Sequence, residues 1–91
     1  MRVITPGHKY ELDNFEGDKK KYLQFIQKDP LTTSPEDDNY KDLITIENGT
    51  TTEEVLKVIV DRFAYLNKQF PSRKNSIILT KLEESLMWIK N

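Results

Sequence analysis

Hydrophobic and polar residues alternate with a period of two in the first half of the chain. Residues 9–15 and 21–28 both follow this pattern, which is typical of half-buried strands. The sequence at 16–18, Glu-Gly-Asp, is typical of a turn and would join them as an antiparallel hairpin. Residues 42–47 are rich in β-branched side chains and are followed by Asn-Gly at 48–49, so they predict a third strand. The first half therefore predicts a small antiparallel sheet.

Residues 29–42 separate the second and third predicted strands. They contain two Pro, one Thr-Thr-Ser run and an acidic triplet. A segment of this composition buries too little apolar surface to stay ordered by itself. We therefore expect a mobile loop at 29–42, within a sheet region that spans 9–47.

The second half changes to a helical period. Thr51 and Glu54 have the spacing of a capping box, which predicts a helix start. Pro71 would end this helix, and Ser72 or Ser76 could cap a second one after a connection of about five residues. Each helix would have about 18 residues. The apolar stripes that support the two helices are Val55, Leu56, Ile59, Val60, Phe63, Leu66 and Phe70, and then Ile78, Leu79, Leu82, Leu86 and Ile89.

Together these elements predict an α+β fold. An N-terminal antiparallel β-hairpin or three-strand meander is followed by a long antiparallel α-helical hairpin over 51–91. Four apolar residues, Val58, Tyr65, Ile77 and Trp88, fall outside the main helical stripes. An isolated hairpin would leave them in water, so we expect them to pack between subunits.

The composition narrows the class of protein. A chain of 91 residues is one domain, 1–91, and its net charge of -1 lacks the positive field of general nucleic-acid binders. With no Cys and one His, disulfides, thiolate zinc sites and imidazole metal clusters are excluded. No apolar run approaches the roughly 18 residues that span a bilayer, so we expect a soluble intracellular protein that binds neither a nucleic-acid polymer nor a membrane.

The sequence offers little support for catalysis. His8 follows a Pro-Gly turn, where a solvated His is a simpler interpretation than a general base. Glu83 and Glu84 are adjacent in a helix, point about 100° apart and cannot share a proton. The three Gly residues are isolated, which excludes a Gly-rich phosphate loop. We therefore expect a protein that is not an enzyme and needs no cofactor.

The predicted corner between the helices carries groups suited to a nucleotide. Tyr65 offers a flat ring, Asn75 an amide, and Arg62, Arg73 and Lys74 are cations. Such groups stack on a base and neutralise a pyrophosphate. An ordinary polar corner is the alternative interpretation of the same residues.

The chain resembles the phage anti-defence "sponge" proteins that counter Thoeris immunity, whose helical hairpin is shared with the sponges that counter CBASS immunity. The resemblance covers most of the chain outside residues 29–42. It is strongest in the helical half and weaker at the N-terminus. The segments that carry it are 48–62, 65–67, 70–75 and 80–88, and then 7–12 and 23–28.

The resemblance implies a non-catalytic function in the cytoplasm of the infected bacterial host. Family members sequester a cyclic ADP-ribose isomer of the glycocyclic type, and related sponges take cyclic oligonucleotides. They assemble as homo-oligomers with six subunits, and the ligand lies between subunits. By position, Tyr65 would stack on adenine and Asn75 would contact the ligand. The family's Arg-rich phosphate-binding stretch would follow the last residue of this sequence. Either that stretch lies beyond the given sequence, or this member binds through other cations, for which Arg62, Arg73 and Lys74 are the candidates.

A helical-hairpin module that binds another protein, without a small-molecule ligand, is the alternative function. The same surplus of apolar helix surface supports it, because an amphipathic partner could cover that surface as well as a sister subunit could.

Overall fold

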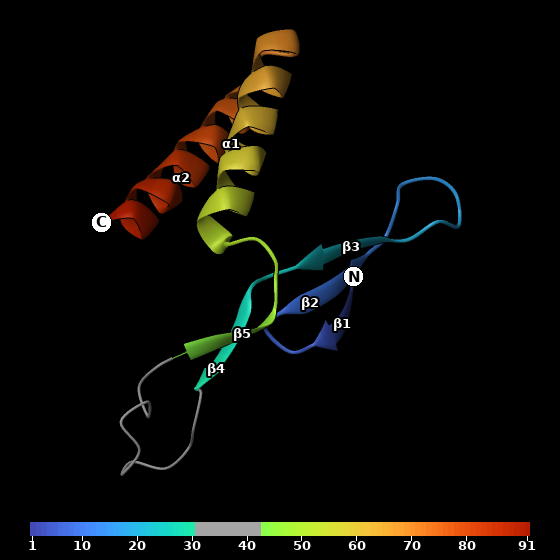
Figure 1. Cartoon of the computed structure of the whole chain (residues 1–91). Helices are drawn as coiled ribbons and strands as arrows, with labels where there is room; N and C mark the ends of the chain where they lie inside the picture. Colours follow the sequence, from blue (N-terminus) through green and yellow to red (C-terminus); the bar gives the residue numbers. More distant parts are fainter. Residues whose placement is uncertain (31–42) are drawn as a thin grey trace. The chain divides into compact units, whose positions relative to one another are not determined.

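The computed structural model describes residues 1–30 and 43–91 (Figure 1). Its elements follow the order β1 (Arg2–Thr5), β2 (Lys9–Leu12), β3 (Lys21–Gln24), β4 (Gln27–Pro30), β5 (Leu43–Glu47), α1 (Thr52–Gln69) and α2 (Arg73–Lys90). The chain divides into two compact units, Met1–Thr50 and Thr51–Asn91. An antiparallel strand meander followed by two helices confirms the predicted α+β class.

The first unit contains a three-stranded antiparallel sheet in the order β1-β2-β3. The predicted hairpin corresponds to β2 and β3, whose register places Tyr10 opposite Leu23. The Tyr10 ring also meets Phe25 edge to face, with 6.1 Å between ring centroids. Strand β1 was not predicted from the sequence. It pairs with β2 through a turn at Gly7, where φ is 74°, a conformation that favours glycine.

A second, two-stranded antiparallel sheet consists of β4 and β5. The predicted third strand, 42–47, is therefore present as β5, but its partner is β4 and not the β2–β3 hairpin. Asp29 and Pro30 belong to β4, so the prediction that the loop begins at Asp29 was wrong. Pairing with β5 is the physical reason, because it gives these residues backbone partners that the sequence alone does not show. The rest of the predicted mobile loop, 31–42, lies outside the described residues.

The predicted strand 21–28 is interrupted between β3 and β4. Phe25 forms an isolated parallel bridge with Thr50. The Thr50 amide donates to the Gln24 carbonyl, and the Ile26 amide donates to the Thr50 carbonyl, both at 2.9 Å. Backbone groups of Gln24 and Ile26 therefore bond to Thr50, and they do not continue the pairing of a single strand over 21–28.

Gly49 makes this close approach possible. A Cβ at this position would overlap the Gln24 carbonyl oxygen and would lie 2.7 Å from the Phe25 carbonyl carbon. These are backbone atoms, which cannot rotate away as a flexible side chain can. Any larger residue at position 49 would therefore displace the segment that leads into the second unit.

The two helices begin at the residues expected from their capping signals. The Thr51 hydroxyl accepts a hydrogen bond from the Glu54 amide at 3.2 Å, which confirms the first helix start. Ser72, and not Ser76, caps α2 by accepting from the Asn75 amide at 3.0 Å. Helix α1 ends at Gln69, so the connection spans residues 70–72 and is shorter than the predicted five residues. Both helices have 18 residues, as predicted.

The contact between α1 and α2 is the apolar layer of the second unit. Its half-buried side chains come from both predicted stripes, and they are Val55, Leu56, Val60, Phe63 and Leu66 from α1 and Ile78, Leu79, Leu82 and Leu86 from α2. Across the described parts of the chain, no residue is fully buried. The four residues predicted to lie outside the stripes are exposed, namely Val58 (63%), Tyr65 (61%), Ile77 (48%) and Trp88 (69%).

Candidate functional site

The corner between α1 and α2 is held by polar side chains. Asn67 donates from Nδ2 to the Ser76 hydroxyl at 3.2 Å and accepts at Oδ1 from the Ser72 amide at 3.4 Å. One Asn side chain therefore ties the last turn of α1 to the cap and the first turn of α2. Sequence reasoning gave Asn67 no role, although its position on the α2-facing side of the helical wheel could have indicated one.

Asn75 belongs to this corner. Its Nδ2 donates to the Phe70 carbonyl at 3.1 Å, and its backbone amide is engaged by the Ser72 cap. The side chain is half-buried. Asn75 thus satisfies one of the carbonyl groups that the end of α1 leaves open, which is a structural function in its own right.

Tyr65 lies on the opposite side of α1. Asn67 marks the α2-facing side, because it bonds to Ser72 and Ser76. Two residues along a helix correspond to a rotation of about 200°, so Tyr65 points away from α2. Its exposed fraction of 61% agrees with that placement. The hairpin therefore does not bring Tyr65 and Asn75 to a common pocket within one chain.

The three candidate cations are divided in the same way. Arg62 precedes Tyr65 by three residues, so both lie on the outer face of α1. Arg73 and Lys74 are exposed in the first turn of α2, next to Asn75 in sequence. This first turn has no acidic residue, whereas α1 begins with Glu53 and Glu54.

Cations at a helix start oppose the helix macrodipole, because the free backbone amides there already carry partial positive charge. The first turn of α2 therefore costs stability unless an anion lies near it. An anionic ligand would be attracted both by the side chains of Arg73 and Lys74 and by the end of the helix.

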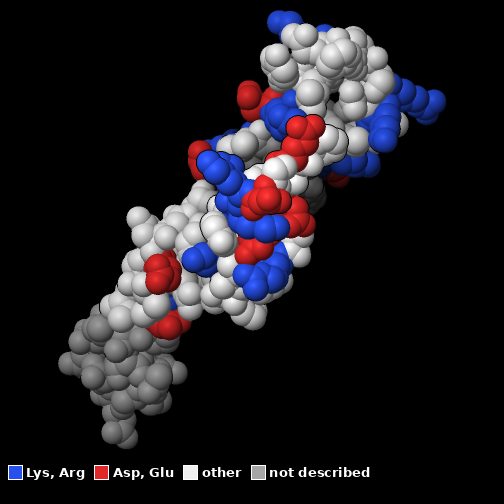
Figure 2. Space-filling model, turned by 90° about the vertical axis from the view of Figure 1, so that its right-hand side faces the viewer, with Lys and Arg blue, Asp and Glu red and all other residues white. Residues whose placement is uncertain are grey.

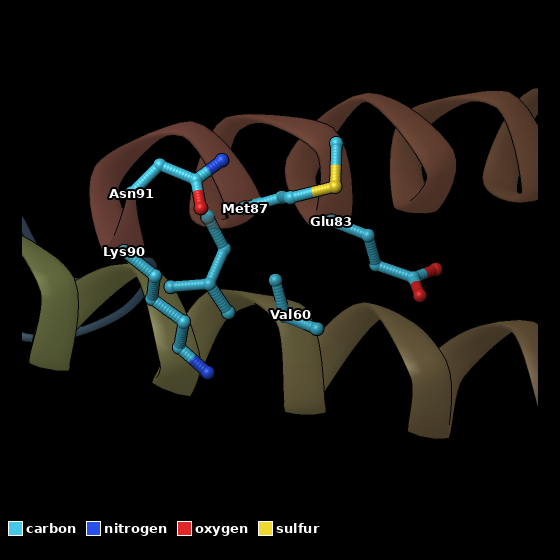
Figure 3. A pocket seen from close by; sticks show the side chains of 6 residues that line it. Val60, Glu83, Met87, Lys90 and Asn91 are labelled. Atoms are coloured by element: carbon cyan, nitrogen blue, oxygen red, sulfur yellow. The ribbon is translucent and has the colours of Figure 1, made fainter.

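A hollow of about 450 Å³ lies along the helical hairpin, away from this corner. Figure 3 shows Val60 on α1 facing side chains that come from α2. Apolar groups form its middle, while the Lys90 ammonium and the Glu83 carboxylate carry opposite charges at its sides (Figure 3). None of the five residues predicted to bind a ligand lines this hollow, so it is a separate feature that the sequence did not indicate.

The N-terminal sheet carries a group of ion pairs. Glu11 accepts from Arg2 Nη2 at 2.7 Å, and Lys20 Nζ lies 3.4 Å from an Asp13 carboxylate oxygen. Hydrogen bonds from the amino group of Met1 and from Lys20 hold the pKa of Asp13 below its ordinary value. Side chains of both signs also lie close together on the face drawn in Figure 2. The charges of this cluster are therefore paired with one another.

The remaining chemistry is limited. The His8 ring nitrogen Nδ1 lies 3.0 Å from the Pro6 carbonyl oxygen, within its own turn. Within 1–30 and 43–91, no group of three His, Asp or Glu side chains is placed to hold a metal ion. No helix in this part of the chain is both long and apolar enough to cross a membrane.

Comparisons with known proteins bear on the helical half. The profile of the Acb2/Tad1 hairpin domain matches residues 29–91, a range that includes both helices and the corner. A segment of 43 residues is 40% identical to a protein of Bacillus phage SBSphiJ7 named Thoeris anti-defense 1. That alignment covers 46% of this chain and 30% of the relative.

Proposed function

Because the chain belongs to the Acb2/Tad1 hairpin-domain family, we propose that it is a phage anti-defence protein that sequesters a cyclic ADP-ribose-type immune signal without cleaving it. Cyclic oligonucleotides are a second class of signal to test. Capture would prevent activation of the host's Thoeris or CBASS effector, in the cytoplasm of the infected bacterium. The single observation that carries this proposal is the family match across both helices and their corner.

In this proposal the ligand lies between copies of the chain. Tyr65 stacks on the adenine ring and Asn75 contacts the same ligand, yet the two side chains lie on different sides of one hairpin. A single ligand reaches both only if Tyr65 comes from one copy and Asn75 from another. We therefore propose that the protein works as a symmetric homo-oligomer. The family resemblance implies that it has six copies.

The cations contribute charge-assisted hydrogen bonds to the phosphates. Arg62 lies one helical turn from Tyr65, so it would contact the side of the ligand nearest the adenine. Arg73 and Lys74 would contact phosphate beside Asn75, where the α2 dipole adds to their attraction. This division gives each half of the site its own positive charge.

The test is recovery of intact ligand. The protein is incubated with a cyclic ADP-ribose isomer, freed of unbound ligand by gel filtration and then denatured by heat. Release of unchanged isomer, in proportion to the protein added, supports capture, because a sponge must bind stoichiometrically and release slowly. No retained isomer, or recovery of a hydrolysed product, would contradict the proposal. The same procedure with cyclic di- and trinucleotides tests the second class of signal.

A protein-binding module is the second candidate function. The exposure of Val58, Ile77 and Trp88 favours it, since a partner protein could cover these residues. Tyr65→Ala separates the two functions. It removes ligand retention under the first function and leaves the oligomer intact, whereas under the second function there is no ligand retention to lose.

A further inference from the structure

One exposed face of α2 has a self-complementary order of residues. Ile77, Lys81, Glu84 and Trp88 follow the spacing i, i+4, i+7 and i+11, so they lie within about 60° of one another around the helix. All four are exposed, and Trp88 is 69% accessible. This α2 face carries an apolar residue at each end and two opposite charges between them.

We propose that this α2 face binds the same face of a second copy, with the two α2 helices antiparallel about a two-fold axis. In such a contact, the chain runs in opposite directions in the two helices, so every pair of facing residues has the same sum of residue numbers. The pair 77 and 88 and the pair 81 and 84 have the same sum, so both pairs face each other in one register. Ile77 therefore meets the partner's Trp88, and Lys81 meets the partner's Glu84. The two-fold axis repeats both contacts.

The surface beside Ile77 fits the partner's ring. A hollow of about 260 Å³ lies on this side of α2, lined by Arg73, Ser76, Ile77, Thr80 and Lys81. The register places the partner's Trp88 over this hollow, as a side-chain knob enters a hole between four residues of a facing helix. Cationic groups at its edge would also be attracted to the face of an indole ring. The hollow and the charge pattern are two separate observations that indicate the same register.

Other arrangements of the two α2 helices are less favourable. A parallel pair places Lys81 against the partner's Lys81 and Glu84 against the partner's Glu84. Sliding the antiparallel pair by one turn in one direction places Ile77 against the partner's Glu84. Sliding it in the other direction places Trp88 against the partner's Lys81 and leaves Glu84 without an opposite charge. Of these arrangements, only the antiparallel register that pairs Ile77 with Trp88 buries both apolar residues and places Lys81 opposite Glu84.

This contact goes beyond the proposed function, because it requires no ligand. It identifies the surface of a second copy that covers Ile77 and Trp88, two of the four exposed apolar residues that lie outside the main helical stripes. Failure of capture would leave the contact untouched, because the contact is measured without ligand. Failure of the contact at this register would mean that the copies assemble through another surface, and capture by that assembly could still be measured.

Charge exchange tests the register. Lys81→Glu replaces two attractive contacts with two repulsive ones across the axis, and Glu84→Lys does the same. We expect each change to raise the dimer dissociation constant roughly tenfold. The double exchange restores opposite charges and should return the constant to within about threefold of wild type. Analytical ultracentrifugation of the full chain gives the constants.

Two variants on another side of α2 are matched controls. Lys90→Glu and Glu83→Lys make the same charge changes beside the 450 Å³ hollow, away from the α2 face. They should leave association unchanged. The proposal is overturned if Lys81→Glu and Lys90→Glu weaken association equally, or if the double exchange associates no better than the single variants. Circular dichroism confirms that each variant keeps its helices.

Fluorescence and cross-linking give independent measurements. Trp88 is the sole Trp of the sequence, so the emission reports the surroundings of this one side chain. The emission should move to shorter wavelength as protein concentration rises, and Lys81→Glu should shift that transition to about tenfold higher concentration. The chain has no Cys, so a mixture of Lys81→Cys and Glu84→Cys chains should form a mixed disulfide. A mixture of Lys81→Cys with Lys90→Cys should not.

Emission that does not change between monomer and oligomer would overturn the proposal. So would a Lys81→Cys chain that joins a cysteine placed at Arg62 of α1 in preference to one at Glu84. Association through another surface, or a different partner for this α2 face, would give these results.

Discussion

Mixing two inactive variants tests whether the ligand site is shared between copies. Tyr65→Ala removes the ring that would stack on adenine, a change worth about 1–3 kcal/mol per stacked base. Asn75→Ala removes the amide on the other side of the hairpin. Each variant alone should retain little ligand. Subunits are then exchanged by co-expressing the two variants in equal amounts.

The geometry sets the size of the recovery. In the mixture, half of all Tyr65 positions and half of all Asn75 positions are wild type. We consider a site to which one copy supplies Tyr65 and another copy supplies Asn75. About one quarter of the sites then carry both side chains, because the two choices are independent. A site built within one chain would recover nothing, since no chain in the mixture carries both. Equilibrium dialysis with a cyclic ADP-ribose isomer measures the sites per chain.

Loss of Asn75 also affects the fold, so a structural control is needed. Its hydrogen bond to the Phe70 carbonyl is worth about 1 kcal/mol. Asn67→Ala removes comparable bonds to Ser72 and Ser76 at the same corner. It should lower the melting temperature similarly while retaining ligand. Recovery in the mixture that does not exceed the average of the two separate variants would refute the shared site.

Three further changes have defined outcomes. Ser72→Ala should destabilise the chain by about 1 kcal/mol and lower Tm by roughly 4–8 °C in thermal circular dichroism, because it removes the cap of α2. Ser85→Ala in mid-helix should change Tm little, and equal shifts would contradict the capping argument. Gly49→Ala should reduce hydrogen-exchange protection in the first unit by a factor corresponding to about 1–3 kcal/mol, since its methyl group meets backbone atoms, and unchanged protection would contradict that clash. Arg62→Gln should weaken capture of a cyclic ADP-ribose isomer roughly 10- to 100-fold in calorimetry. Lys57→Gln is the control, because the Lys57 ammonium lies near Glu side chains of the first turn of α1, and it should change capture less than threefold. Similar losses in both variants would contradict a specific contact between Arg62 and the ligand.

The helices could be predicted closely because their signals are local. Each extends over 18 residues of consistent periodicity, and the Thr51 cap lies within one turn of the helix it starts. The error in the connection has an equally local cause. Ser72 and Ser76 both have the chemistry of a cap, and the hydrogen bond from the Asn75 amide to the Ser72 hydroxyl shows that Ser72 begins α2. A sequence pattern alone cannot choose between them.

The sheets could be predicted less well because their pairing is not local. Strand β1 has only four residues, too few to establish a period, and its existence depends on pairing with β2. The break between β3 and β4 depends on Thr50, which lies far along the sequence from the residues it bonds. Alternation continues through that break, so the pattern indicates one strand where the chain forms two.

The candidate site shows the same division between local and non-local information. The chemistry of Tyr65, Asn75 and the three cations could be taken from the sequence and its resemblance to a family. Their separation onto different sides of the hairpin could not, because it depends on which side of α1 meets α2. In the proposed function, this separation is the reason for a site that two copies complete.

A site completed by two copies couples capture to assembly. Ligand that binds only the assembled state stabilises it, by about 2.7 kcal/mol when its free concentration is 100 times Kd. Thermodynamic reciprocity then requires that weaker assembly also weakens capture by the same factor. Trp88→Ala, which lies outside the proposed ligand contacts, should therefore lower the apparent ligand affinity at low protein concentration and not at high concentration. Titrations of the cyclic ADP-ribose isomer at two protein concentrations measure this difference. If the variant assembles less but binds ligand equally well at both concentrations, each chain holds its ligand alone.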